Sequence, residues 1–254
     1  MIFETIFTPF DFISGIFSNI ILIIGVIASI SVILKYYRTR KRDFLLFSIT
    51  ILVLIEPWMP SGISFIVALF TYGEGLPAPI YIFIGNAFIP IGLITWTIIF
   101  TDLILIDKQK IVLLIVILFS TVFEIHLFYF LFTNNHLMIG DRVGATDINY
   151  ENLQMIFLSI ILMYILITGI TFGIETLKTN EPELKIKGRL MIVGFSSFIV
   201  FGAIDTIITW NEIALVLIRI LGIFAAFSLY GGFFLPNWMR RIIQEVDSFF
   251  KSLF

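Results

Sequence analysis

Five ionisable side chains stand inside long apolar stretches of this sequence: Glu56, Glu124, His126, Asp205 and Arg219. A charge surrounded by apolar side chains or lipid is costly unless it is paired, hydrogen-bonded or in contact with water. Acids, a histidine and an arginine in such places could bind a charged ligand, relay protons or form a structural ion pair. These residues are therefore the first candidates for a functional site.

Asp205 and Arg219 are the candidates most easily paired. Asp205 lies shortly before the end of one apolar stretch, and Arg219 lies shortly after the start of the next. Two consecutive helices would hold them at the same depth in the membrane. We therefore expect an Asp205–Arg219 ion pair, the arrangement that costs the least free energy when both charges lie in a low dielectric. A ligand-facing or proton-relay role is the alternative.

Glu124 and His126 are two positions apart in the sequence. On an α-helix this spacing separates two side chains by about 200°, so both cannot face one cavity unless the helix is distorted. We expect Glu124 to face the helix bundle and His126 to lie at an interface.

Glu56 is followed by Pro57 and Pro60 in the same apolar stretch, and Pro90 lies in the next one. Each proline removes a backbone donor and bends a helix. The prolines of the first stretch would free the carbonyls of Val53 and Glu56. They predict either ordinary kinks or a hinge and cavity, where a ligand, water or polar side chain could bond the freed carbonyls.

The elements that carry these residues are membrane helices. The chain of 254 residues is 59% hydrophobic and only 13% charged, and its mean hydropathy is +1.06. Roughly a quarter of a soluble domain is charged, so a water-soluble protein is excluded. Apolar runs of about 20 residues predict membrane-spanning helices. We expect an all-α bundle of seven such helices, over roughly 12–35, 44–71, 78–106, 111–133, 153–177, 188–210 and 213–235.

The distribution of basic residues predicts the orientation of these helices. All but two of the 16 Lys and Arg residues fall in loops on one side and in the C-terminal tail; Arg142 lies on the opposite side and Arg219 within a span. Short loops rich in Lys and Arg stay in the cytoplasm. The sequence therefore predicts an outside N-terminus, a cytoplasmic C-terminus and a multi-pass protein of the cell membrane.

Four polar residues in the outer half of their spans predict a cavity: Asn86, Glu124, Asp205 and Arg219. Residues 133–152 would form its roof, and aromatic side chains such as Trp96 and Phe201 would close it below. The alternative is a set of separate polar groups, each satisfied among the many Phe side chains.

Residues 1–235 would form the membrane domain and residues 236–254 a cytoplasmic tail helix. The tail has one apolar stripe, made of Met239, Ile242, Val246, Phe249 and Leu253. Such a stripe favours a helix lying on the membrane surface, with pairing to a partner helix as the alternative.

Small residues predict close helix packing in two places. Gly169 and Gly173 are four apart in one span, as are Gly222 and Ala226 in another. Such pairs let helix backbones approach closely. We expect both pairs to pack within the bundle rather than to form a dimer.

Composition excludes several kinds of chemistry. The chain has 0 Cys and 2 His residues, so it lacks the ligands of a thiolate or polyhistidine metal centre, and we expect no metal and no cofactor. The residue pairs needed for intramembrane proteolysis are absent from the sequence, so we expect no enzyme. A retinal protein would need a lysine in the last span, which has none; Arg219 stays protonated and cannot substitute.

The topology resembles the seven-helix sensor proteins of prokaryotes, of the kind found in archaea, including the membrane input domains that precede histidine kinases. The resemblance rests on seven spans, a kinked second span and the junction Pro236-Asn-Trp-Met-Arg-Arg241. It implies sensing or signalling, with the difference that no output domain follows Phe254.

The leading expectation is a sensor or receptor-like protein that binds a small or lipophilic ligand from outside and signals to a separate cytoplasmic protein. One alternative is a small transporter or proton-coupled channel that uses the intramembrane acids and Arg219. Another is a non-catalytic assembly subunit. The lipid bilayer is the expected partner, no nucleic acid is expected, and the oligomeric state stays open.

Overall fold

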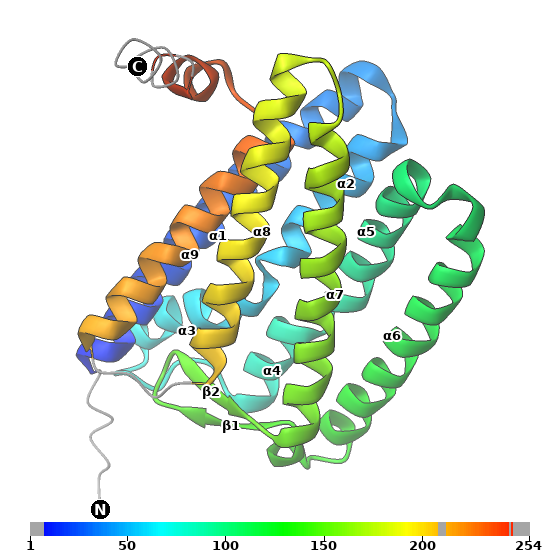
Figure 1. The fold of residues 1–254 in the computed structure, drawn as a ribbon. Helices are drawn as coiled ribbons and strands as arrows, with labels where there is room; N and C mark the ends of the chain where they lie inside the picture. Colours follow the sequence, from blue (N-terminus) through cyan, green and yellow to red (C-terminus); the bar gives the residue numbers. More distant parts are fainter. Residues whose placement is uncertain (1–7, 208–211, 244, 246–254) are drawn as a thin grey trace, which may run out of the picture.

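The computed structural model describes residues 8–207, 212–243 and 245. In this part of the chain helices predominate, and one short β-hairpin crosses one end of the bundle (Figure 1). The helices and strands are α1 (Pro9–Thr39), α2 (Arg42–Leu54), η1 (Glu56–Trp58), α3 (Met59–Phe70), α4 (Ala78–Asn86), α5 (Ile89–Ile104), η2 (Ile106–Lys108), α6 (Gln109–Phe132), η3 (His136–Met138), β1 (Gly140–Val143), β2 (Asp147–Tyr150), α7 (Asn152–Leu177), α8 (Pro182–Ile207) and α9 (Glu212–Phe233).

Seven segments of the described chain are long and apolar enough to cross a membrane. They are Pro9–Thr39, Arg42–Phe70, Ala78–Ile104, Ile106–Phe132, Asn152–Leu177, Pro182–Asp205 and Ile213–Phe233. The predicted all-α seven-helix bundle is confirmed, and the chain is an integral membrane protein in contact with the lipid bilayer.

The second and third spans are both broken near their middle. In the second, Pro57 and Pro60 lack backbone donors, and the turn η1 joins α2 to α3. The third bends between α4 and α5, just before Pro90. The predicted kinks are therefore present. The carbonyl of Glu56, predicted to be free, accepts a bond from the N–H of Met59 instead, because the tight turn offers it a nearer donor.

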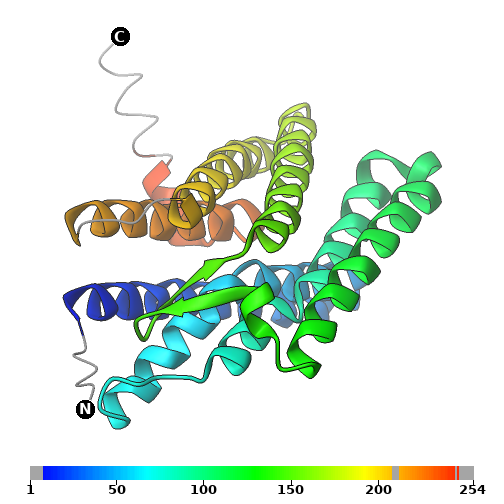
Figure 2. The same ribbon diagram turned by 90° about the horizontal axis from the view of Figure 1, so that it is seen from below.

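The spans are arranged so that the first and last lie side by side. In Figures 1 and 2, α1 runs along α9, while α7, α8 and α9 pack in sequence and α6 lies at the outer edge against α5. We call the end that carries the N-terminus of α1 and the β-hairpin the hairpin end. The opposite end, where the loops at Arg40–Lys41 and Lys178–Glu181 lie, is called the basic end.

Strands β1 and β2 pair antiparallel, with Gly140 opposite Tyr150 and Val143 opposite Asp147. Gly144 opens the three-residue connection with a φ of +65°, a conformation that favours glycine. A Cβ atom there would lie 2.7 Å from the carboxylate of Asp11. The hairpin therefore fits closely on the start of α1, and Figure 2 shows it in front of the helices.

The glycines predicted to allow close packing do so inside the bundle. A Cβ atom on Gly169 would lie 2.4 Å from Phe195, one on Gly173 2.6 Å from Ile192, and one on Gly222 2.7 Å from Phe201. All three contacts are made with α8. Ala226 lines a small second cavity that α1, α2, α8 and α9 enclose.

The tail begins as a helix over residues 237–243. Arg240 pairs with Glu183 at the start of α8, at 2.8 Å. Three members of the predicted apolar stripe, Val246, Phe249 and Leu253, lie outside the described residues, so the stripe as a whole stays a prediction.

Candidate functional site

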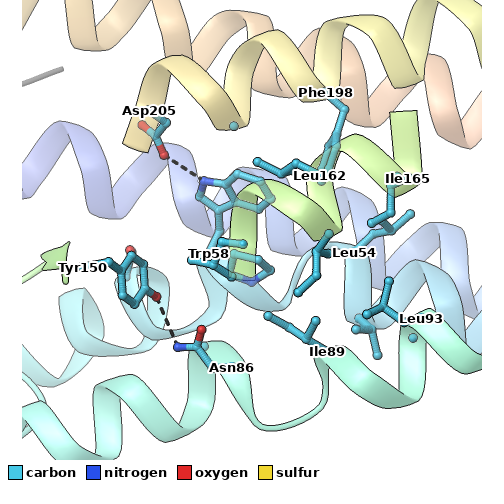
Figure 3. A pocket seen from close by; sticks show the side chains of 18 of the residues that line it. Leu54, Trp58, Asn86, Ile89, Leu93, Tyr150, Leu162, Ile165, Phe198 and Asp205 are labelled. Atoms are coloured by element: carbon cyan, nitrogen blue, oxygen red, sulfur yellow. Dashed lines mark hydrogen bonds between the residues drawn. The ribbon is translucent and has the colours of Figure 1, made fainter. Parts of the chain in front are cut away.

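A cavity of about 130 Å³ lies inside the bundle beneath the hairpin. Its wall comes from α2, η1, α3, α4, α5, α7, α8, α9 and β2; among the described residues, α1 and α6 contribute none. Asn86, Asp205 and Arg219 all line it, as the sequence predicted. Figure 3 shows the apolar wall, formed by side chains such as Leu54, Trp58, Ile89, Leu93, Leu162 and Phe198.

Asp205 and Arg219 form the predicted ion pair at the polar end of the cavity. Nη1 of Arg219 lies 3.2 Å from Oδ2 of Asp205. The same carboxylate oxygen accepts a hydrogen bond of 3.2 Å from Nε1 of Trp58, which extends from η1 (Figure 3). A side chain at the helix break is thus joined directly to the charged pair.

The guanidinium of Arg219 is almost completely enclosed, with a side-chain exposure of 4%. Nη2 donates to Oγ of Ser14 on α1 at 3.2 Å. Nε and Nη1 have no hydrogen-bond acceptor among the described residues. Nη1 is near Asp205, but its N–H groups are not directed at the carboxylate, so the contact is electrostatic and the donors stay unused.

Asn86 joins three elements at the opposite side of the cavity. Nδ2 donates to the Ile82 carbonyl at 2.9 Å and to the Tyr150 hydroxyl at 3.2 Å, as Figure 3 shows for the second bond. Oδ1 accepts from Nε2 of Gln154 on α7 at 2.9 Å. Asn86 therefore connects α4 with the hairpin and with α7, and its polar groups are bonded within the protein.

The hairpin forms the roof of the cavity, as residues 133–152 were predicted to do. The carboxylate of Asp11 holds its turn, accepting from the N–H groups of Ala145 at 2.8 Å and Thr146 at 3.2 Å. Tyr81 adds a second anchor, since its hydroxyl donates to the Thr146 carbonyl at 2.9 Å. Arg142 adds a third by donating to the carbonyls of Glu74 and Leu76 in the loop before α4.

Asp147 places a third charged group in the cavity wall. The pKa of its carboxyl is raised to about 6, mainly by burial and also by the negative charges of Asp205 and Asp11, while the Ile148 N–H and Arg219 act in the opposite direction. Protonation of Asp147 is therefore easier than for an exposed aspartate, and it occurs within two units of neutral pH.

Aromatic side chains close the cavity toward the basic end. Trp96 lines the cavity, donates from Nε1 to Thr168 Oγ1 at 2.7 Å, and packs 5.4 Å from the ring of Phe195 and 5.7 Å from that of Phe172. Trp96 thus forms the predicted floor. Phe201 does not line this cavity: it stacks on the far side of Trp58 at 4.7 Å, because the indole stands between it and the open space.

Glu56 is enclosed but lies outside the cavity wall, with an exposure of 1%. Oε1 accepts from the backbone N–H of Phe88 at 2.7 Å, at the break between α4 and α5. The carboxylate therefore replaces a bond that the broken helix has lost. Oε2 has no partner among the described residues.

Glu124 was predicted to contribute to the cavity, and that prediction is wrong, whereas His126 lies at a helix interface as predicted. His126 is the buried residue, at 9% exposure, and its ring packs 5.1 Å from Phe130 and 5.4 Å from Phe157 of α7. Glu124 is partly exposed, with its Oε2 atom buried, and it does not line the cavity. The physical reason is the position of α6 at the edge: α5 and α7 separate it from the cavity, and the face toward α7 is aromatic.

Several residues of the site were missed by sequence reasoning: Asp11, Trp58, Ser61, Tyr81, Asp147 and Tyr150. Alternating polar and apolar residues around Gly144 are a hairpin signal that could have placed Asp147 and Tyr150 on one strand. No sequence signal singles out Trp58 or Tyr81 among so many aromatic residues. In the described chain no group of three or more His, Asp or Glu residues is placed to hold a metal ion.

Comparison with protein-family models, curated proteins and solved structures finds no match.

Proposed function

We propose that this protein is a seven-helix membrane sensor that binds a small, largely apolar ligand beneath the hairpin and signals from its basic end to a separate cytoplasmic protein. The observation that carries the proposal is a cavity with polar groups at one end and a closed aromatic floor at the other. The hairpin end would face outward, as the positive-inside rule predicts.

The shape of the cavity supports ligand binding. Binding sites for small molecules are mostly apolar and contain a few convergent polar groups. This cavity has Asn86, Asp205 and Arg219 among aliphatic and aromatic side chains. A cavity of about 150 Å³ can take a ligand the size of benzene, so a volume of about 130 Å³ suits a small compound.

The closed floor favours a sensor over a transporter. A translocation path would have to continue from the cavity to Glu56 and on toward Asp102 near the basic end. Neither residue lines the cavity. Asp102 instead pairs with Arg42 at 2.5 Å on the other side of the aromatic floor.

The broken second span supplies a route for the signal. Pro57 and Trp58 of η1 line the cavity, and α2 runs from η1 to the loop at the basic end. Prolines and helix breaks are places where a span can change its bend. A ligand against Trp58 would alter that bend and move α2 relative to α1.

Substituted-cysteine labelling tests the closed floor, because the chain has 0 Cys residues of its own. Ser61→Cys lies in the cavity wall, Thr101→Cys lies below Trp96 on α5, and Asn149→Cys is exposed on the hairpin. With a small membrane-impermeant thiol reagent added on the hairpin side, we expect reaction at 149 and slower reaction at 61. Thr101→Cys should stay unmodified. Reaction of Thr101→Cys from that side would reveal a continuous path and support a transporter instead.

A further inference from the structure

Arg219, which lines the cavity, has hydrogen-bond donors that nothing in the described chain uses. Arg219 is 3% exposed, and its Nε and Nη1 atoms lack an acceptor. A guanidinium has five N–H groups, of which the structure engages one with Ser14. Buried donors are normally satisfied, so unused ones in a cavity wall call for an acceptor from outside the protein.

Asp205 lies 3.2 Å from Nη1 but makes no directed hydrogen bond with it, and Nε has no acceptor among the described residues. Asp205 accepts from Trp58, and Asp147 accepts from the backbone N–H of Ile148 at 2.9 Å. Asn86 is occupied by Tyr150 and Gln154. What the wall lacks is therefore an acceptor in the direction of the unused N–H groups of Arg219 rather than another donor.

Charge balance restricts the kind of acceptor. Two acids, Asp147 and Asp205, already face one base, Arg219, in the same wall. An added carboxylate or phosphate would place a third negative charge in a low-dielectric space without a counter-ion. An ammonium group could approach the acids, but it would repel the guanidinium and leave its donors unused. An uncharged oxygen acceptor satisfies both conditions.

The remaining wall specifies the body of the ligand. Trp58, Leu93, Trp96, Leu162 and Phe198 present aromatic and aliphatic surface, which favours a flat apolar group. The space of about 130 Å³ is close to the cavity size that accepts benzene.

We infer that the cavity takes a small uncharged ligand with one aromatic or branched apolar group and one oxygen acceptor, such as a ketone or ester carbonyl, which accepts from Arg219. This inference rests on the proposed function, since it names the ligand class of the same cavity. It makes Arg219 the residue that selects the ligand's head group and the apolar wall the part that selects its size.

Four compounds of similar shape test the head group: acetophenone, ethylbenzene, benzoate and benzylammonium. Affinities are measured with the full chain in nanodiscs at neutral pH, by ligand-observed NMR and by the shift in melting temperature. Empty nanodiscs correct for partition into lipid. We expect acetophenone to bind at least about tenfold more tightly than ethylbenzene, because a hydrogen bond to a buried charged group has about that effect. Both ions should bind more weakly than acetophenone.

Two variants of α8 show whether binding occurs in the cavity. Gly202 lines it, and a Cβ atom there would make an ordinary contact of 3.5 Å with Leu162. Gly202→Leu should therefore fold, fill the cavity and abolish binding of all four compounds. Val200→Leu is the matched control, since Val200 is 48% exposed on the outside of the same helix, and it should bind as the parent protein does.

A double variant, Arg219→Met with Asp205→Leu, tests the role of Arg219 without leaving one charge unpaired. In it, acetophenone and ethylbenzene should bind equally. Measurements on the parent protein alone can overturn the inference. If it bound acetophenone and ethylbenzene equally, or bound benzoate or benzylammonium more tightly than acetophenone, the head group would be assigned wrongly. The cavity would still be a ligand site. If none of the four compounds binds, the cavity is not a ligand site, and the proposed function fails with the inference.

Discussion

Glu56 and Asp205 are both carboxylates within membrane spans, yet the protein surrounds them differently. Glu56 accepts a hydrogen bond from the backbone of a broken helix and does not contact the cavity. Asp205 is held by the side chains of Trp58 and Arg219 and lines the cavity, with a side-chain exposure of 17%. A charge in a membrane helix is therefore not enough to mark a site. The kind of partner and the space beside the charge distinguish a residue that completes the fold from one that can meet a ligand.

The largest effect should follow from breaking the ion pair. Arg219→Met leaves Asp205 without its counter-ion, and removal of one partner of a buried pair typically costs about 3–5 kcal/mol. Asp205→Leu should lower stability by a similar amount, because it leaves Arg219 buried without its counter-ion. Melting temperatures of the purified variants measure this loss. The double variant should recover most of it, and a double variant as unstable as the single ones would contradict an energetic pairing.

At Glu56, the stability of the protein should depend on the acceptor oxygen of the side chain rather than on its charge. Glu56→Leu leaves the N–H of Phe88 buried without a partner, which costs about 1–3 kcal/mol. Glu56→Gln keeps a carbonyl oxygen in place and should be close to the parent in melting temperature. Neither change should affect ligand binding once the protein is folded. If Glu56→Gln abolished binding while stability was kept, Glu56 would belong to the site and the contrast with Asp205 would disappear.

A smaller effect concerns Asp147 and pH. Because its folded-state pKa is raised from 3.8 to about 6, its stabilising contribution is fully present below about pH 4 and is lost as the pH rises through about 6. Asp11 on α1, Asp205 on α8 and Arg219 on α9 are the charged groups that act on it. Between pH 4 and 7 the parent protein should lose stability relative to Asp147→Asn, whose side chain does not titrate. If the melting temperatures of the two proteins changed in parallel with pH across this range, the pKa of the Asp147 carboxyl would not be raised.

The smallest effect is expected at the basic end. Arg42 pairs with Asp102 at 2.5 Å, but its side chain is 70% exposed. Exposed pairs usually contribute less than about 1 kcal/mol. Arg42→Ala should therefore change the melting temperature little and leave ligand binding unchanged. A loss comparable to that of Arg219→Met would show that water and lipid headgroups screen this end less than its exposure indicates.

The sequence predicted the spans and the ion pair because both depend on local patterns. Each span is a continuous apolar run, and the prolines mark the helix breaks. Asp205 and Arg219 could be paired because consecutive antiparallel helices place residues of equal depth side by side.

Other features depend on contacts between distant parts of the chain. The acceptor role of Glu56 involves a backbone N–H 32 positions away, and a backbone group carries no sequence signal. The position of α6 at the edge of the bundle keeps Glu124 out of the cavity, and the packing of His126 on Phe157 involves a neighbouring helix. Asp11 holds a turn 134 positions later, so the roof could be assigned to residues 133–152 without its anchor being identified.

The contact between α1 and α9 has a consequence for biogenesis. Nη2 of Arg219 donates to Ser14, which lies 205 positions earlier in the chain. Chains are made from the N-terminus, so α1 enters the bilayer long before its neighbour exists. Arg219 then enters beside α8, and the Asp205 carried by α8 lowers the cost of inserting a cation. The α8–α9 pair can therefore dock on α1 only after both of its helices have been made, and a chain that lacks α9 would leave Ser14 without this contact.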